Sequence, residues 1–168
     1  TGQHVLDMLD GGGVKLTVAS GSNANQMIQQ YLEPEIFEQI NGKQVTLAAI
    51  VTENSMSLPT YFRVGTTAYG NIPAGQTGLF FATATINYKT GQNYIGFQCF
   101  DRANQNGQSI SLRAFTMEEG SIQTLGYQDS SGVLQLLERP DPVELLKCRR
   151  YQQVILPEAN RTTVFVGT

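Results

Sequence analysis

Apolar and polar positions alternate along much of the chain up to Gly120, and this period of two predicts short β-strands. The clearest strand is residues 43–52, in which Val45, Leu47 and Ala49 fall on one face. The same pattern predicts further strands over residues 14–19, 58–66, 79–88, 94–100 and 108–117. Residues 26–32 (QMIQQYL) fit a strand, although a helical turn stays open there.

The breaks in this pattern predict one helix and two irregular stretches. Ile36, Phe37 and Ile40 have helical spacing, and the Asn41-Gly42 pair is a stop signal, so we expect one or two helical turns covering an end of a sheet. Residues 70–78 predict a loop, and the alternation ends after Gly120.

About seven or eight strands separated by turns, with no alternation of strands and helices, indicate an antiparallel sandwich. The 17 Gly, seven Tyr and eight Phe agree with such a fold. A jelly roll is favoured over an immunoglobulin-like topology, because the Trp and paired-Cys marks of the latter are missing. The expected fold class is therefore all-β, an antiparallel β-sandwich (jelly roll) with one or two short helices.

Residues 140–153 predict a capped helix at a junction. Asp141 is an N-cap acceptor, Pro142 takes the first helical position, and Glu144 completes a capping box. Apolar side chains lie on more than one face of this helix, so we expect it to be wedged between two bodies. The expected junction or subunit contacts are Val143, Leu146, Cys148, Arg150 and Tyr151. The domain prediction is residues 1–139 for the sandwich, 140–153 for the helix, and 154–168 for a following β segment or C-terminal strand.

Charge and cysteine content exclude some partners. The net charge of −3 is small and the basic residues are scattered, so neither a nucleic acid nor membrane insertion is indicated. Cys99 and Cys148 have no metal-site spacing, and two buried thiols are favoured over a disulfide, which stays open. The chain starts at Thr1 rather than Met, so we expect it to be part of a longer protein.

Two segments carry a resemblance to a known family. A strand ending in an apolar residue and Glu-Gly, residues 114–121 (AFTMEEGS), precedes residues 144–151 (ELLKCRRY). This combination resembles the carbohydrate-binding-module-like jelly-roll domains of phage tail fibres and tailspikes, and the order of the segments from residue 26 to residue 52 is similar too. The family usually has a Trp where this chain has residues 48–50 (AAI) and an aromatic where it has Gln152, which counts against a sugar platform at those two places.

The resemblance implies a non-catalytic domain of a virion tail fibre or tailspike that faces outward and recognises host cell-surface polysaccharide. It also implies a homotrimer and further domains of a longer fibre chain. Two alternatives stay open. The domain is a structural trimerisation or stabilisation module of the fibre, or it is part of a polysaccharide depolymerase.

The sequence contains few signs of catalysis or of metal binding. His4 is the only histidine, so a nucleophilic triad would have to include it, and no carboxylate pair is singled out by its surroundings. We predict no enzyme and no cofactor in this segment. The His and Cys clusters of a zinc site are absent from the sequence, and a structural calcium ion stays open, with Asp7 and Asp10 as the nearest candidate ligands.

Sugar binding needs aromatic faces together with planar amide or guanidinium groups. Strand periodicity places Tyr61 with Arg63 on one face and Tyr94 with Gln98 on one face, whereas Tyr69 and Tyr88 border loops. For any single one of these tyrosines, a core residue whose hydroxyl reaches the edge is the alternative. The candidate carbohydrate-binding residues are Tyr61, Arg63, Tyr69, Tyr88, Tyr94, Gln98 and Arg113.

Overall fold

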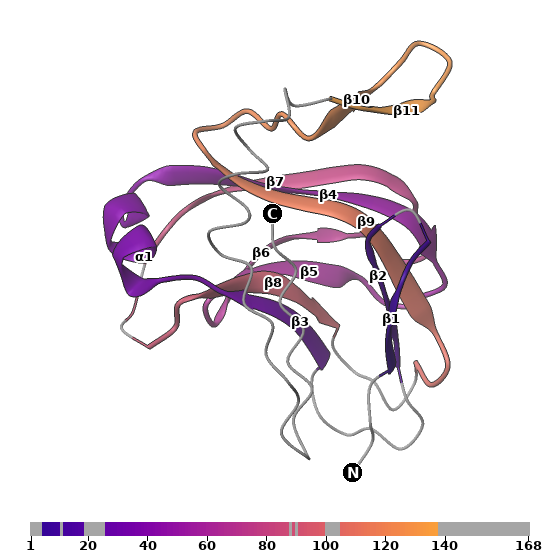
Figure 1. The fold of residues 1–168 in the computed structure, drawn as a ribbon, viewed down its shortest axis with the longest axis horizontal. Helices are drawn as coiled ribbons and strands as arrows, with labels where there is room; N and C mark the ends of the chain where they lie inside the picture. Colours follow the sequence, from indigo (N-terminus) through magenta and orange to yellow (C-terminus); the bar gives the residue numbers. More distant parts are fainter. Residues whose placement is uncertain are drawn as a thin grey trace. The chain divides into compact units, whose positions relative to one another are not determined.

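The computed structural model describes residues 5–10, 12–18, 26–87, 89, 91–99 and 105–137. Within these residues two antiparallel sheets pack face to face, so the predicted all-β sandwich is confirmed (Figure 1). The chain divides into two units after Leu136. The predicted helix over residues 140–153 and the segment 154–168 lie outside the described residues. So do the predicted sites His4, Tyr88, Val143, Leu146, Cys148, Arg150 and Tyr151.

The larger sheet, called sheet A here, has the strand order β1-β2-β9-β4-β7. Its strands are β1 (Val5–Met8), β2 (Val14–Thr17), β4 (Gln44–Asn54), β7 (Gly78–Thr85) and β9 (Ser109–Glu119). The second sheet, sheet B, has the order β3-β8-β5-β6. Its strands are β3 (Gln26–Tyr31), β5 (Thr60–Val64), β6 (Thr67–Ile72) and β8 (Tyr94–Cys99).

The strand pairing is that of a jelly roll. Early strands pair with late ones, β2 with β9, β3 with β8 and β4 with β7, and β5 pairs with its successor β6. These pairs form one long hairpin that is rolled into two sheets. The topology therefore brings segments far apart in the sequence, such as β3 and β8, side by side.

The core lies between the sheets and is aromatic at its centre. Phe97 of β8 contacts Phe62 of sheet B at a ring-centroid distance of 5.4 Å and Phe115 of sheet A at 4.7 Å. Helix α1 (Pro34–Ile40) buries Phe37 against this core at one end of the sandwich, as predicted (Figure 1). No helix among the described residues is long and apolar enough to span a membrane.

The predicted loop over residues 70–78 was wrong in part, because β6 extends to Ile72. Its Gly70 weakens the alternation, yet glycine is needed there: a Cβ atom would lie 2.6 Å from the Cβ of Ala82 in β7. The sequence pattern also missed β1 and the hairpin of β10 (Gly126–Gln128) and β11 (Leu134–Leu136). These strands have three or four residues each, too few for a period to be recognised.

Candidate functional site

Sheet B presents most of the predicted sugar-binding side chains on its outer face. In β5, Phe62 and Val64 are buried in the core, so Tyr61 and Arg63 point to the opposite, outer side. In β8 the core residues Ile95, Phe97 and Cys99 likewise alternate with Tyr94, Gly96 and Gln98 on the opposite side of the sheet, where Gly96 and Gln98 are also buried. Strand periodicity had predicted this division correctly.

Strand register brings the two predicted pairs together. Tyr61 lies opposite Gln98, and Arg63 lies opposite Gly96. Because Gly96 has no side chain, no Cβ separates Arg63 from the next strand, β3, at this level of the sheet. The glycine is required by packing as well, since a Cβ atom there would lie 1.9 Å from the carbonyl oxygen of Ile28.

The edge strand β3 adds residues that sequence reasoning did not select. Tyr31 lies opposite Tyr94, with the ring centroids 5.6 Å apart, and is half exposed. Gln29 lies opposite Gly96, and Met27 lies opposite Gln98. The period of two in residues 26–32 (QMIQQYL) could have identified this strand and its outward side chains, but a helical turn had remained an alternative there. On the other side, β6 contributes Asn71 opposite Tyr61.

We call this set of outward residues the tyrosine face. It consists of Met27, Gln29, Tyr31, Tyr61, Arg63, Asn71, Tyr94 and Gln98. It combines aromatic rings with amide and guanidinium groups on four neighbouring strands.

Two polar atoms of the tyrosine face are buried without a hydrogen-bond partner among the described residues. They are Oε1 of Gln98, a residue only 4% exposed, and Nε of Arg63. The Arg63 side chain is anchored at one point, where Nη2 donates to the Thr66 carbonyl oxygen. A buried polar atom without a partner costs about 1–3 kcal/mol. The tyrosine face therefore has one acceptor and one donor that are left unpaired in the described chain and have almost no exposed surface.

The structure does not bring the other predicted sugar-binding residues to this face. Tyr69 lies opposite Phe62, packs against the core and places its hydroxyl 3.4 Å from the Thr85 carbonyl oxygen. Arg113 is exposed on sheet A, where the pairing of β4 with β9 shifts register. Both side chains therefore face surfaces other than the tyrosine face.

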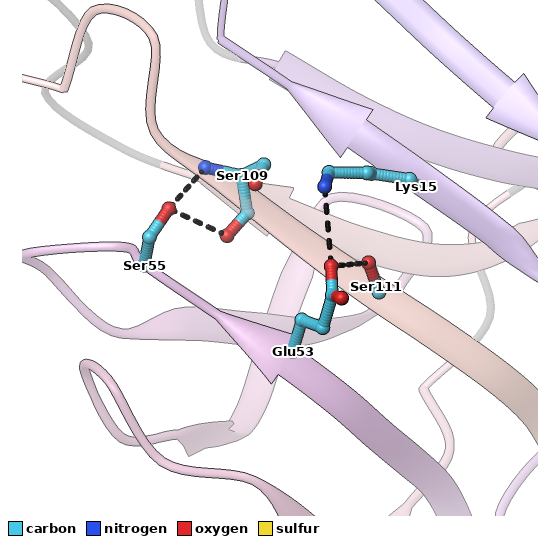
Figure 2. Close-up of polar contacts among 5 residues, drawn as sticks. All are labelled: Lys15, Glu53, Ser55, Ser109 and Ser111. Atoms are coloured by element: carbon cyan, nitrogen blue, oxygen red, sulfur yellow. Dashed lines mark hydrogen bonds and ion pairs between the residues drawn. The ribbon is translucent and has the colours of Figure 1, made fainter.

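The outer face of sheet A differs because its polar groups bind one another. Figure 2 shows that Glu53 accepts hydrogen bonds from Lys15 and Ser111, each at 3.1 Å, across three strands. The Lys15 ammonium is the first cause, and the Ser111 hydroxyl the second, of a pKa of Glu53 below its ordinary value. Nearby, the Ser55 hydroxyl donates to the Ser109 carbonyl oxygen and accepts from the Ser109 amide (Figure 2).

Farther along sheet A, the paired carboxylates of Glu118 and Glu119 have structural partners. Glu118 accepts hydrogen bonds from the amide and the hydroxyl of Thr124 at 3.0 and 2.7 Å. Glu119 forms an ion pair with Lys43 at 3.0 Å. These contacts give each of the two carboxylates a partner within the protein.

The predicted calcium ligands Asp7 and Asp10 are both exposed, in and just after β1. Among the residues that the structure describes, no group of three or more His, Cys, Asp or Glu side chains is placed to hold a metal ion. Calcium at this hairpin thus remains a prediction from the sequence.

Buried Cys99 has its sulfur 3.5 Å from the Thr60 hydroxyl oxygen. Cys148, the second of the two predicted thiols, lies outside the described residues.

Comparison with known protein families, with curated proteins and with solved structures found no match to this chain.

Proposed function

We propose that the tyrosine face binds saccharides and that the domain is a non-catalytic glycan-binding module. The observation that carries this proposal is the set of tyrosine, glutamine and arginine side chains gathered on one outer face by strands β3, β5 and β8. Tyrosine rings pack on the apolar faces of sugar rings, and planar amide and guanidinium groups bind the hydroxyls.

The unpaired atoms of Gln98 and Arg63 support the same proposal. A sugar hydroxyl both donates and accepts hydrogen bonds, so a saccharide can donate to Gln98 Oε1 and accept from Arg63 Nε once these covered side chains turn outward. A purely apolar ligand would leave both atoms unsatisfied. The expected ligand is therefore polar and also has an apolar surface, which is the chemical character of a sugar ring.

The setting we propose is a phage tail fibre or tailspike that recognises host surface polysaccharide. Its support is the resemblance carried by residues 114–121 and 144–151. The described part of the first segment is consistent with that pattern, since β9 ends at Glu119 and Gly120 follows with a φ of 103°.

A glycan array followed by calorimetric titration tests saccharide binding. We expect Tyr61→Ala and Tyr94→Ala to weaken binding of any array ligand about tenfold, the effect of losing a buried aromatic contact. Tyr127→Ala is the matched control, because this tyrosine is half exposed on β10. Silence across a broad panel, or equal losses in all three variants, contradicts the proposal.

A structural role in a trimeric fibre is a second candidate, favoured by exposed apolar side chains in and around β10 and β11. These side chains are Ile122, Tyr127, Val133 and Leu136. Asp129 is the only charged residue between positions 122 and 137. Its carboxylate accepts hydrogen bonds from the Ser131 hydroxyl and the Val133 amide within the turn.

Light scattering of the whole chain tests this second role. We expect an oligomer, and we expect Val133→Asp to weaken it because the variant places a charge in an apolar contact. A monomer at all concentrations counts against the structural role and leaves saccharide binding untouched.

A further inference from the structure

The charge distribution of sheet B is one-sided. Arg63 is the only charged residue in its four strands, which read QMIQQY, TYFRV, TAYGNI and YIGFQC. The chain as a whole carries a net charge of −3. The acidic residues nearest to these strands along the chain are Glu33 and Asp101, each two residues beyond the end of a strand. The tyrosine face thus has a single positive centre and no carboxylate of its own.

Among the described residues, the Arg63 guanidinium also has no counter-ion. No ion pair joins it to a carboxylate within the described part of the chain, and its only recorded protein contact is a neutral carbonyl oxygen. A partly buried guanidinium without an anion is poorly compensated for its lost hydration. Its planar array of donors matches the two oxygens of a carboxylate, which it binds more strongly than a neutral acceptor.

We propose that the tyrosine face selects acidic saccharides, with the sugar carboxylate paired to Arg63 and an adjacent hydroxyl donating to Gln98 Oε1. This inference rests on the proposed function. Arg63 and Gln98 are diagonal neighbours on adjacent strands, a spacing of about 7–8 Å, so one short saccharide contacts both. The tyrosines supply sugar-ring contacts that do not depend on charge.

The test is calorimetric titration of the full 168-residue protein with matched pairs of polysaccharides. Polygalacturonate, alginate, hyaluronate and polysialate are each compared with their carboxyl-reduced derivatives, which keep the linkages and lose the negative charge. We expect at least one acidic polymer to bind about tenfold more tightly than its reduced form, the effect of one charge-assisted hydrogen-bonded pair. Added salt should narrow this difference.

Two variants of Arg63 and one control locate the effect. Arg63→Gln should abolish the preference for the acidic form, while Arg63→Lys, which keeps the charge but loses the planar fork, should retain part of it. Arg113→Gln removes the same charge from sheet A and should leave the preference intact. Circular dichroism establishes whether each variant is folded. If Arg63→Gln does not fold, the partial loss of preference expected of Arg63→Lys still tests the proposal.

The outcomes separate the two proposals. Equal binding of acidic and reduced polymers, or a preference that survives in Arg63→Gln, overturns acidic selectivity and leaves saccharide binding standing. Absence of binding to every acidic and every reduced polymer overturns acidic selectivity, and silence of the broader glycan array overturns the proposed function as well.

Discussion

The outer faces of the two sheets use polar side chains in opposite ways. On sheet A, Glu53 is held by Lys15 and Ser111, and Glu118 is held by Thr124. On sheet B, Gln98 and Arg63 each keep a buried polar atom without a partner in the described chain. Buried polar groups are normally hydrogen-bonded, as those on sheet A are, so the unpaired groups of sheet B require an explanation. This difference identifies the tyrosine face as the candidate site.

The largest expected effect concerns the core that both sheets share. Phe97→Ala removes contacts to Phe62 and Phe115 and should lower the free energy of unfolding by about 3–5 kcal/mol. Phe81→Ala is the matched control, because this ring is 58% exposed on β7, and it should change stability by about 1 kcal/mol or less. Chemical denaturation measures the free energy of unfolding of both variants. Similar losses in the two would contradict a core centred on Phe97.

An intermediate effect compares two tyrosines of equal exposure. Tyr31 on β3 and Tyr127 on β10 are both 50% exposed, so truncation of either should affect stability similarly. Only Tyr31→Ala should weaken saccharide binding, by roughly tenfold, because it removes the ring beside Tyr94. Calorimetric titration of the two variants with the same saccharide measures this difference. A larger loss of affinity in Tyr127→Ala would indicate that the binding site lies on the β10–β11 hairpin.

The smallest effect is the pH dependence of sheet A. Hydrogen bonds from Lys15 and Ser111 hold the pKa of Glu53 below its ordinary value of 4.5. Glu53 therefore stabilises the fold at pH values above 4.5, and this contribution is lost as the pH falls through the lower folded-state pKa.

Unfolding midpoints measured against pH check this contribution. Glu53→Gln should flatten the acidic decline of the midpoint slightly, and Glu38→Gln, at an exposed position of α1, should not. Saccharide binding should be unchanged in Glu53→Gln, because Glu53 belongs to sheet A. If the unfolding midpoint of Glu53→Gln falls with decreasing pH as steeply as that of the unmodified protein, groups other than Glu53 cause the decline.

Sequence periodicity predicted much of the fold for a physical reason. Strands such as β2 and β5 bury every second residue, so their apolar residues alternate and can be recognised locally. Strand β6 could not be recognised because Gly70 and Asn71 interrupt its pattern, and its place depends on pairing with β5. The three-residue strands β10 and β11 depend in the same way on contacts distant in sequence, such as Leu125 with Ile50.

The candidate site, too, could be predicted only in part from local sequence. Alternation placed Tyr61 with Arg63, and Tyr94 with Gln98, on common faces, but only the strand order brings β5 next to β8. Tyr69 and Arg113 were selected for their side-chain chemistry. The register of β6 turns Tyr69 toward the core, and the topology puts Arg113 on the other sheet. Chemistry can be predicted from local sequence, whereas the gathering of distant residues depends on topology.

The most direct test of the central claim is to map saccharide binding by NMR. Amide resonances of the whole protein are followed during titration with a saccharide identified on the glycan array. The account predicts shifts concentrated at Tyr31, Arg63, Tyr94 and Gln98, with Phe81 and Arg113 unmoved. Shifts concentrated on sheet A or on the β10–β11 hairpin, with sheet B unmoved, would contradict it.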